Sequence, residues 1–176
     1  MTMPSPVDPV GLMQLAQQNA RHGEGHVEPN PMVGAVVATA DGLVISTGYH
    51  QHFGGAHAEI NAIQAAGSAT VGNDLYVTLE PCSHFGKTPP CADAVIKAGI
   101  RRVFIGCQDP APHVAGQGIQ RLRDAGLEVT VGVCETESRR LIAPFEMLML
   151  QRRPWVHAKW AMTLDGRIAS RNGHSR

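Results

Sequence analysis

The sequence is poor in aromatic residues and cysteines, and it carries no net charge. Aromatic residues make up 5% of the 176 residues, 15 basic residues balance 15 acidic ones, and four cysteines form no disulfide framework in a chain of this length. Apolar runs stay well below the ~20 residues that a membrane-spanning helix needs. The N-terminus lacks the basic and apolar stretches of a signal peptide. We therefore expect a cytoplasmic protein that neither enters a membrane nor coats nucleic acid.

Charge is distributed unevenly along the chain. Residues 1–88 contain seven acidic and two basic side chains, whereas residues 89–176 contain eight acidic and thirteen basic ones. A solvated face, or an interface with a missing partner, would explain this bias. The alternative is a basic groove for a phosphate-bearing or polynucleotide partner, and the sequence leaves both open.

Periodicity and turn residues predict alternating strands and helices. Strands are expected over residues 32–39, 43–49, 74–79, 102–107 and 128–133. Helices are expected from residue 9 to near residue 23, and over residues 57–66, 91–98, 117–125 and 135–150. The first two strands form a hairpin, and the later ones are joined by helical crossovers. The predicted fold is α/β, a three-layer α/β/α sandwich with a five-stranded mixed sheet.

A fresh strand pattern begins after the last predicted helix, over residues 155–161. It follows two arginines and a proline, and it looks like the start of another domain. We therefore expect one domain over residues 1–150, with residues 151–176 as a linker and the truncated start of a second domain.

One histidine, one glutamate and two cysteines form the pattern that indicates chemistry. His57 and Glu59 stand two residues apart, Cys82 follows a proline, and Cys91 begins a predicted helix. One imidazole and two thiolates suit a tetrahedral zinc ion that keeps its fourth position for water. The arrangement H-x-E, P-C and C is how zinc nucleobase deaminases are recognised, with the glutamate as acid and base. Helix starts at His57 and Cys91 favour the thiolate form of the ligands.

The segment between the two cysteines contains a possible fourth zinc ligand and is a candidate for substrate recognition. His84 lies there, and as a fourth ligand it would close a purely structural zinc site, although such a site has no need for Glu59. Eight residues separate Cys82 from Cys91, where the general deaminase pattern has two. Because this enlarged loop places His84 and Lys87 beside the metal, we expect it to contact the substrate and to determine specificity.

Several runs resemble one family of zinc deaminases. The run 76–91 (YVTLEPCSHFGKTPPC) is similar to the deaminase domain of the bifunctional riboflavin-biosynthesis deaminase/reductase, which is cytidine deaminase-like. The runs 29–37 (PNPMVGAVV), 54–60 (GGAHAEI) and 98–100 (AGI) resemble the same family, and residues 159–169 are similar to the opening of its reductase domain. The resemblance covers essentially the whole chain.

The activity of that family is what the resemblance implies for this chain. Its members deaminate 2,5-diamino-6-ribosylamino-4(3H)-pyrimidinone 5′-phosphate to 5-amino-6-ribosylamino-2,4(1H,3H)-pyrimidinedione 5′-phosphate, with release of ammonia. The positions that match His57, Cys82 and Cys91 hold zinc there, and the position that matches Glu59 shuttles protons. The resemblance also implies substrate contacts from Asn30, His50, His84, Lys87 and Asp109.

The resemblance also implies the partners. NADPH and the reduction are expected only of a reductase domain that this chain does not contain, so the chain is expected to be a fragment or to work with a separate reductase chain. The expected partners are the phosphorylated aminopyrimidine and either a second copy of the chain or that reductase domain.

One departure from the family and two alternative functions stay open. The family commonly reads D-P-N-P where this chain has Asp109, Pro110, Ala111 and Pro112, so an amide that would contact ribose or phosphate is missing; His113 is a candidate substitute. One alternative function is a deaminase that acts on a base in RNA or DNA or on a free nucleoside. The other is a non-catalytic structural zinc module.

Overall fold

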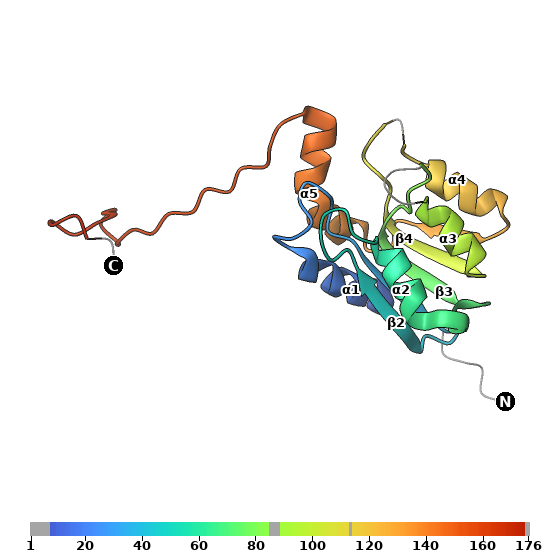
Figure 1. The fold of residues 1–176 in the computed structure, drawn as a ribbon. Coiled ribbons are helices and arrows are strands. Elements are labelled where there is room, and N and C mark those ends of the chain that lie inside the picture. The colour runs from blue at the N-terminus through green and yellow to red at the C-terminus, as the bar shows by residue number, and fades with distance from the viewer. Residues whose placement is uncertain (1–7, 85–88, 113, 175–176) are drawn as a thin grey trace.

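Residues 8–84, 89–112 and 114–174 are described by the structure, a computed structural model of the chain. Five strands form one sheet in the order β2-β1-β3-β4-β5 (Figure 1). The strands are β1 (Gly34–Ala38), β2 (Val44–Tyr49), β3 (Asp74–Leu79), β4 (Arg102–Cys107) and β5 (Glu128–Val131). The α-helices are α1 (Pro9–Ala20), α2 (Ala58–Ala66), α3 (Cys91–Lys97), α4 (Gln117–Asp124) and α5 (Glu135–Gln151). Short 3-10 helices at Arg21–Gly23 and Gly67–Thr70 extend the ends of α1 and α2.

The sheet is mixed, as the sequence predicts. β1 lies antiparallel to both β2 and β3, whereas β3, β4 and β5 run parallel to one another. β5 ends two residues earlier than expected. Gly132 adopts φ +94°, a left-handed conformation that glycine reaches without a steric penalty, and this turns the chain out of the strand.

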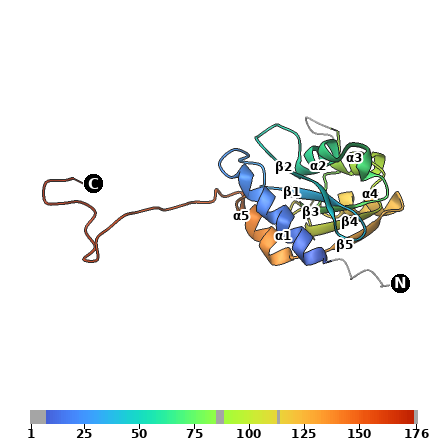
Figure 2. The ribbon, with the colours of Figure 1, turned by 90° about the horizontal axis from the view of Figure 1, so that it is seen from below.

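Helices cover both faces of the sheet. α1 and α5 lie on one face, and α2 and α3 lie on the other (Figure 2). Side chains alternate accordingly along the strands: Val36 and Tyr76 pack into the cluster formed by α1, whereas Ala35 and Val77 belong to the larger core that includes residues of α2, α3 and α4. β3 is buried along its whole length because it lies at the centre of the sheet. The three-layer sandwich is therefore confirmed.

One glycine allows α2 to lie directly on the edge strand β2. A Cβ atom at Gly48 would stand 2.4 Å from the backbone nitrogen of Ala62, which is closer than carbon and nitrogen can approach. The Ser46 hydroxyl donates to the carbonyl oxygen of Ala62 at 2.7 Å, and the Asn61 amide donates to the carbonyl oxygen of Tyr49 at 2.8 Å. These contacts fix the height of α2 above the sheet, and α2 carries part of the candidate site.

The segment after α5 departs from the prediction. Residues 155–161 were expected to form a strand, but described residues 152–174 contain no strand and extend away from the sheet (Figure 1). A strand needs a neighbouring strand for its backbone hydrogen bonds, and none of the five strands pairs with this segment. Its large apolar side chains are exposed: Trp155, Val156, Trp160, Met162, Leu164 and Ile168. Among the described helices, none is long and apolar enough to cross a membrane.

Candidate functional site

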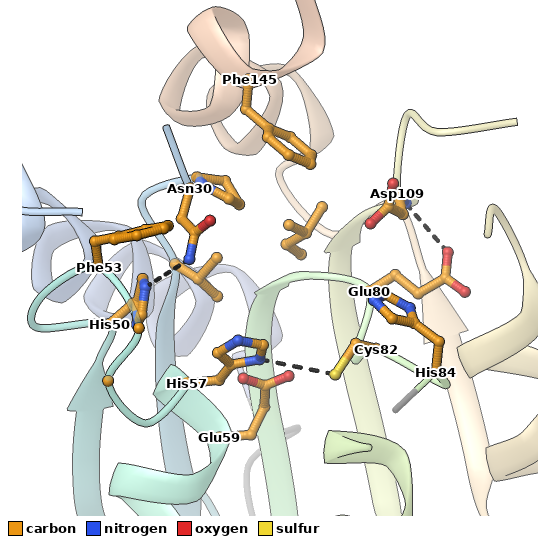
Figure 3. A pocket seen from close by; sticks show the side chains of 15 residues that line it. Asn30, His50, Phe53, His57, Glu59, Glu80, Cys82, His84, Asp109 and Phe145 are labelled. Carbon is orange, nitrogen blue, oxygen red and sulfur yellow. Dashed lines mark hydrogen bonds between the residues drawn. The ribbon is translucent and has the colours of Figure 1, made fainter. Parts of the chain in front are cut away.

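The three predicted metal ligands come together between α2, α3 and the end of β3. The ligand atoms of His57, Cys82 and Cys91 all lie within 4.8 Å of one another. His57 Nδ1 is 3.1 Å from the Cys91 sulfur and 3.7 Å from the Cys82 sulfur (Figure 3 draws the second contact). A tetrahedral zinc ion with its usual bond lengths would hold nitrogen and sulfur ligands roughly 3.5 Å apart. The cluster therefore has the spacing and the donor types that zinc requires.

Local structure explains how distant positions converge. His57 is the last extended residue before α2 begins at Ala58, and Cys91 is the first residue of α3. Cys82 follows the buried strand β3, and two hydrogen bonds tie it to the start of α3. The Cys91 amide donates to the Cys82 sulfur at 3.3 Å, and the Ala92 amide donates to the Cys82 carbonyl oxygen at 3.1 Å. The start of α3 thus directs its first amides at Cys82.

Electrostatics in the cluster favour a thiolate. The hydrogen bond with Cys91 and the nearby His57 lower the pKa of Cys82 to about 4, whereas the proximity of Cys82 raises the pKa of Cys91. The hydrogen bond with Cys82 raises the pKa of His57. Cys82 is thus the sulfur that loses its proton more readily. A divalent cation bound by both sulfur atoms would stabilise both as thiolates.

His84 lies outside the cluster, although it was the candidate fourth ligand of a structural site. Among the described residues, only His57, Cys82 and Cys91 form a group of three or more metal-binding side chains. His84 is exposed and lines the neighbouring pocket. This geometry favours a cluster with room for a fourth, exchangeable ligand.

Glu59 is buried beside the ligand cluster. It lies in the first turn of α2, is 3% exposed, and points its carboxyl group toward the ligands (Figure 3). Burial raises the pKa of Glu59 to about 7, while the positive charge of His57 acts in the opposite direction. A carboxyl group with a pKa near neutrality can both accept and release a proton at the same pH.

A cavity of about 340 Å³ opens above the cluster. Its wall combines the loop before β1, the segment that leads to α2, the ends of β3 and β4, and one residue of α5. The residues that line it are Asn30, Pro31, Val33, His50, Phe53, Gly54, Gly55, His57, Glu59, Leu79, Glu80, Cys82, His84, Asp109 and Phe145. Of the five predicted substrate contacts, four are among them. Lys87 lies outside the described residues, and so does His113.

Asn30 and His50 form a hydrogen-bonded pair whose polarity can be deduced. His50 Nδ1 lies 3.0 Å from the carbonyl oxygen of Ala56, which can only accept, so Nδ1 carries the proton. Burial lowers the pKa of His50, which favours the neutral ring and leaves Nε2 as an acceptor. The Asn30 amide nitrogen, 3.2 Å from Nε2, must therefore be the donor. This leaves the Asn30 carbonyl oxygen directed into the cavity (Figure 3).

The opposite wall contains residues that the sequence did not predict. Glu80 accepts a hydrogen bond from the Asp109 amide at 3.1 Å, and its position directly before the Pro81-Cys82 pair was an available signal. Phe145 points from α5 toward the cavity (Figure 3), and nothing in the sequence of that helix distinguishes it from a core residue. Phe53, 52% exposed, was also not predicted; it lies on the side of Asn30 and His50 (Figure 3), next to the two glycines that precede His57.

Comparison with known families and proteins agrees with this chemistry. Residues 9–107 match the family described as the cytidine and deoxycytidylate deaminase zinc-binding region. Over 164 residues the chain is 49% identical to the riboflavin biosynthesis protein RibD of Aquifex aeolicus (strain VF5), a match that covers 93% of this chain and 46% of that protein. RibD of Escherichia coli (strain K12) is 44% identical, with 93% of this chain and 44% of that protein covered. The chain thus spans about half the length of these relatives.

Solved structures of RibD proteins are also similar to this chain. RibD of Acinetobacter baumannii superposes with a TM-score of 0.87 at 43% identity, covering 96% of this chain and 47% of that one. A diaminohydroxyphosphoribosylaminopyrimidine deaminase/5-amino-6-(5-phosphoribosylamino)uracil reductase from Thermotoga maritima also reaches 0.87, at 45% identity, with 96% and 48% covered. The Rib2 deaminase of Aspergillus oryzae, at 22% identity and a TM-score of 0.62, shares the fold over 77% of this chain and 92% of that one.

Proposed function

The chain belongs to the family of the cytidine and deoxycytidylate deaminase zinc-binding region, and on that premise we propose that it deaminates a phosphorylated aminopyrimidine. The proposed reaction is the conversion of 2,5-diamino-6-ribosylamino-4(3H)-pyrimidinone 5′-phosphate to the corresponding 2,4-pyrimidinedione, with release of ammonia. The observation that carries it is a His-Cys-Cys cluster with a buried glutamate at the base of a cavity. Identity of 41–49% to proteins named RibD supports the choice of substrate.

We propose zinc as the metal of the site. His57, Cys82 and Cys91 would hold it, and when bound there it supplies the Lewis acidity that makes water a nucleophile at neutral pH. Glu59 takes the proton from the attacking water. It gives that proton to the ring nitrogen, then takes the second proton from the hydroxyl now attached to the ring carbon and gives it to the departing amine, so that water and an amino group become a carbonyl and ammonia. Its pKa of about 7 suits both transfers.

The residues that line the cavity orient the substrate. Asn30 offers a carbonyl oxygen, so a group that it contacts must be a hydrogen-bond donor, such as a ring amine or a ribose hydroxyl. Phe53 and Phe145 offer aromatic surface on which a pyrimidine ring can pack. We assign Asp109, His84 and Lys87 to the polar remainder of the substrate, as the resemblance implies.

Two further proposals concern the partner of the chain and its location in the cell. The chain spans about half of RibD proteins, so a reductase domain that uses NADPH is the partner that we propose for it. We also propose a cytoplasmic location, because four free cysteines suit a reducing compartment.

The test is ammonia release by zinc-loaded protein from the ribosylaminopyrimidinone phosphate, run beside cytidine and a single-stranded oligonucleotide. We expect turnover of the ribosylaminopyrimidinone phosphate only, and none after metal depletion. Turnover of cytidine or of the oligonucleotide instead would replace the proposed substrate. No turnover of any of the three by folded, metal-loaded protein would refute a deaminase function.

A further inference from the structure

Glu80 carries a carboxylate that the proposed chemistry does not use. The residue is 6% exposed and follows β3 directly, two residues before Cys82. Across the cavity edge lies the loop of residues 108–116, which joins β4 to α4 and presents Asp109 to the cavity. A buried charge needs compensation, and in the described part of the chain the hydrogen-bond donors to this one belong to that loop and the start of α4.

Four backbone amides donate to the Glu80 carboxylate. Oε2 accepts from Asp109 at 3.1 Å and from Gly116 at 2.9 Å, which are the two ends of the loop. Oε1 accepts from Gly118 at 2.8 Å and from Ile119 at 3.3 Å, in the first turn of α4. Hydrogen bonds to a charged acceptor are stronger than those between neutral groups, so one side chain holds both ends of the loop.

The backbone around Glu80 is built for this close approach. A Cβ atom at Gly118 would stand 1.9 Å from the carbonyl oxygen of Pro81, so only glycine lets α4 begin against this strand end. The Glu80 amide donates to the carbonyl oxygen of Cys107 at 2.9 Å, which continues the pairing of β3 with β4. Asp109 and Cys82 are thereby attached to the same rigid strand ends.

We propose that Glu80 is a positioning residue, whose carboxylate fixes the 108–116 loop so that Asp109 meets the substrate held at the metal cluster. The role of Asp109 rests on the proposed function. The hydrogen bonds by which Glu80 holds the two ends of the loop, called the Glu80 clamp below, do not. Glu80 acts through the backbone, because both of its carboxylate oxygens accept from main-chain amides. A carboxylate is required because all four partners are donors, and an amide side chain offers only one acceptor oxygen.

The experiment compares Glu80→Gln with wild type by amide hydrogen exchange and by kinetics. Glu80→Asp is the second variant, because its shorter side chain keeps the charge but cannot span all four amides. Gln17→Met is the matched control: Gln17 is equally buried and bridges distant segments through the carbonyl oxygen of Cys134 and the hydroxyl of Ser138, but it does not line the cavity.

We expect the amides of Gly116, Gly118 and Ile119 to lose protection in both Glu80 variants and to keep it in Gln17→Met. Zinc content should stay at the wild-type level. Specificity for the ribosylaminopyrimidinone phosphate, kcat/KM, should fall by up to about 10²-fold, the loss typical of small misplacements, and most of the fall should lie in KM. Unchanged protection of these amides would overturn the proposal.

A double-mutant cycle with Asp109→Ala separates positioning from general stability. If Glu80 acts through Asp109, Glu80→Gln should change kcat/KM little once Asp109 is replaced, whereas Gln17→Met should have the same effect in either background. Additive effects of Glu80→Gln and Asp109→Ala would refute the coupling. Failure of wild-type protein to turn over the substrate would refute the proposed function and, with it, the role of Asp109. The exchange data would still show whether Glu80 holds the 108–116 loop.

Discussion

Glu59 owes its proposed role to burial more than to any neighbouring charge. Its position in the first turn of α2 takes the carboxyl group out of water, and this raises its pKa to about 7. The nearby His57 works in the opposite direction, and burial outweighs it. A surface glutamate with the same spacing to the histidine would keep a pKa of about 4 and would accept a proton much less readily at neutral pH.

Replacing Glu59 should separate metal binding from turnover. Glu59→Gln keeps the size of the side chain and removes the proton acceptor, so we expect kcat to fall by at least about 10²-fold with zinc content unchanged. Ammonia release and metal analysis on the same sample measure this. As a control, Glu24→Gln on the exposed surface should behave as wild type. A Glu59→Gln protein with near-normal kcat would show that another group moves the proton.

The polarity of Asn30 gives a second test at the residue scale. Asn30→Ala removes the carbonyl oxygen from the cavity, so we expect KM for the ribosylaminopyrimidinone phosphate to rise about 10-fold, the worth of one hydrogen bond. Asn30→Asp should be at least as impaired, because a carboxylate cannot donate to His50 Nε2. Asn73→Ala is the matched control, since its amide donates to Ala69 far from the cavity. Full activity of Asn30→Asp would contradict the deduced polarity.

At the scale of elements, the contact between α2 and β2 determines where His57 and Glu59 stand. Gly48→Ala should place a methyl group against the backbone of α2 and lower the free energy of unfolding by about 1–3 kcal/mol. Because His57 and Glu59 would move with α2, kcat/KM should fall more than in a variant that is equally destabilised away from α2. Thr47→Ala, on the exposed side of the same strand, should change little. Thermal denaturation and kinetics together measure both effects.

The elements that the sequence predicted correctly are those whose signals are local. The apolar run of β3, the aspartate before α1 with a proline at its first position, and the glycines that end α2 and α3 are each readable within a few residues, and the structure contains each element. The convergence of His57, Cys82 and Cys91 was predictable because a motif records a three-dimensional constraint in sequence spacing. Phe145 was not, since its approach to the cavity depends on how α5 packs across the sheet.

The strand expected at residues 155–161 shows the limit of local patterns. Alternating residues record that a segment can form a strand but not which strand would pair with it. Glu80 illustrates the same limit for a single side chain. The motif residues next to it are recognisable from the sequence. Its four hydrogen-bond donors are not, because they lie 29 to 39 residues further along the chain.

At the scale of the whole molecule, the segment after α5 contributes little to the stability of the domain. Described residues 152–174 are almost entirely exposed, so ending the chain at Arg153 should leave the Tm within about 2 °C of the longer protein. Removing Trp155, Trp160 and the other exposed apolar side chains should also reduce self-association. Calorimetry and light scattering measure these outcomes. A large fall in Tm would mean that the segment packs against the domain.

Metal removal should destabilise the whole domain, because the cluster joins α2, α3 and the end of β3. A ligand at a thousand times its Kd stabilises the folded state by about 4 kcal/mol, so chelation should lower the Tm by roughly 10 °C. Cys82→Ser should bring the Tm close to that of the chelated protein and abolish the response to chelator. Cys134→Ser, outside the cluster, should keep that response. An unchanged Tm on metal removal would argue against a metal in this cluster.

The Glu80 clamp also bears on how the specificity of this enzyme could be redesigned. The carboxylate holds the amides of Asp109 and Gly116, so both ends of the segment between them are anchored independently of its interior. Loops fixed at both ends are natural graft points, since a new interior need not re-create its own anchorage. Libraries that vary residues 110–115 while keeping Glu80, Gly116 and Gly118 should therefore retain the scaffold and the metal cluster while they explore new substrates.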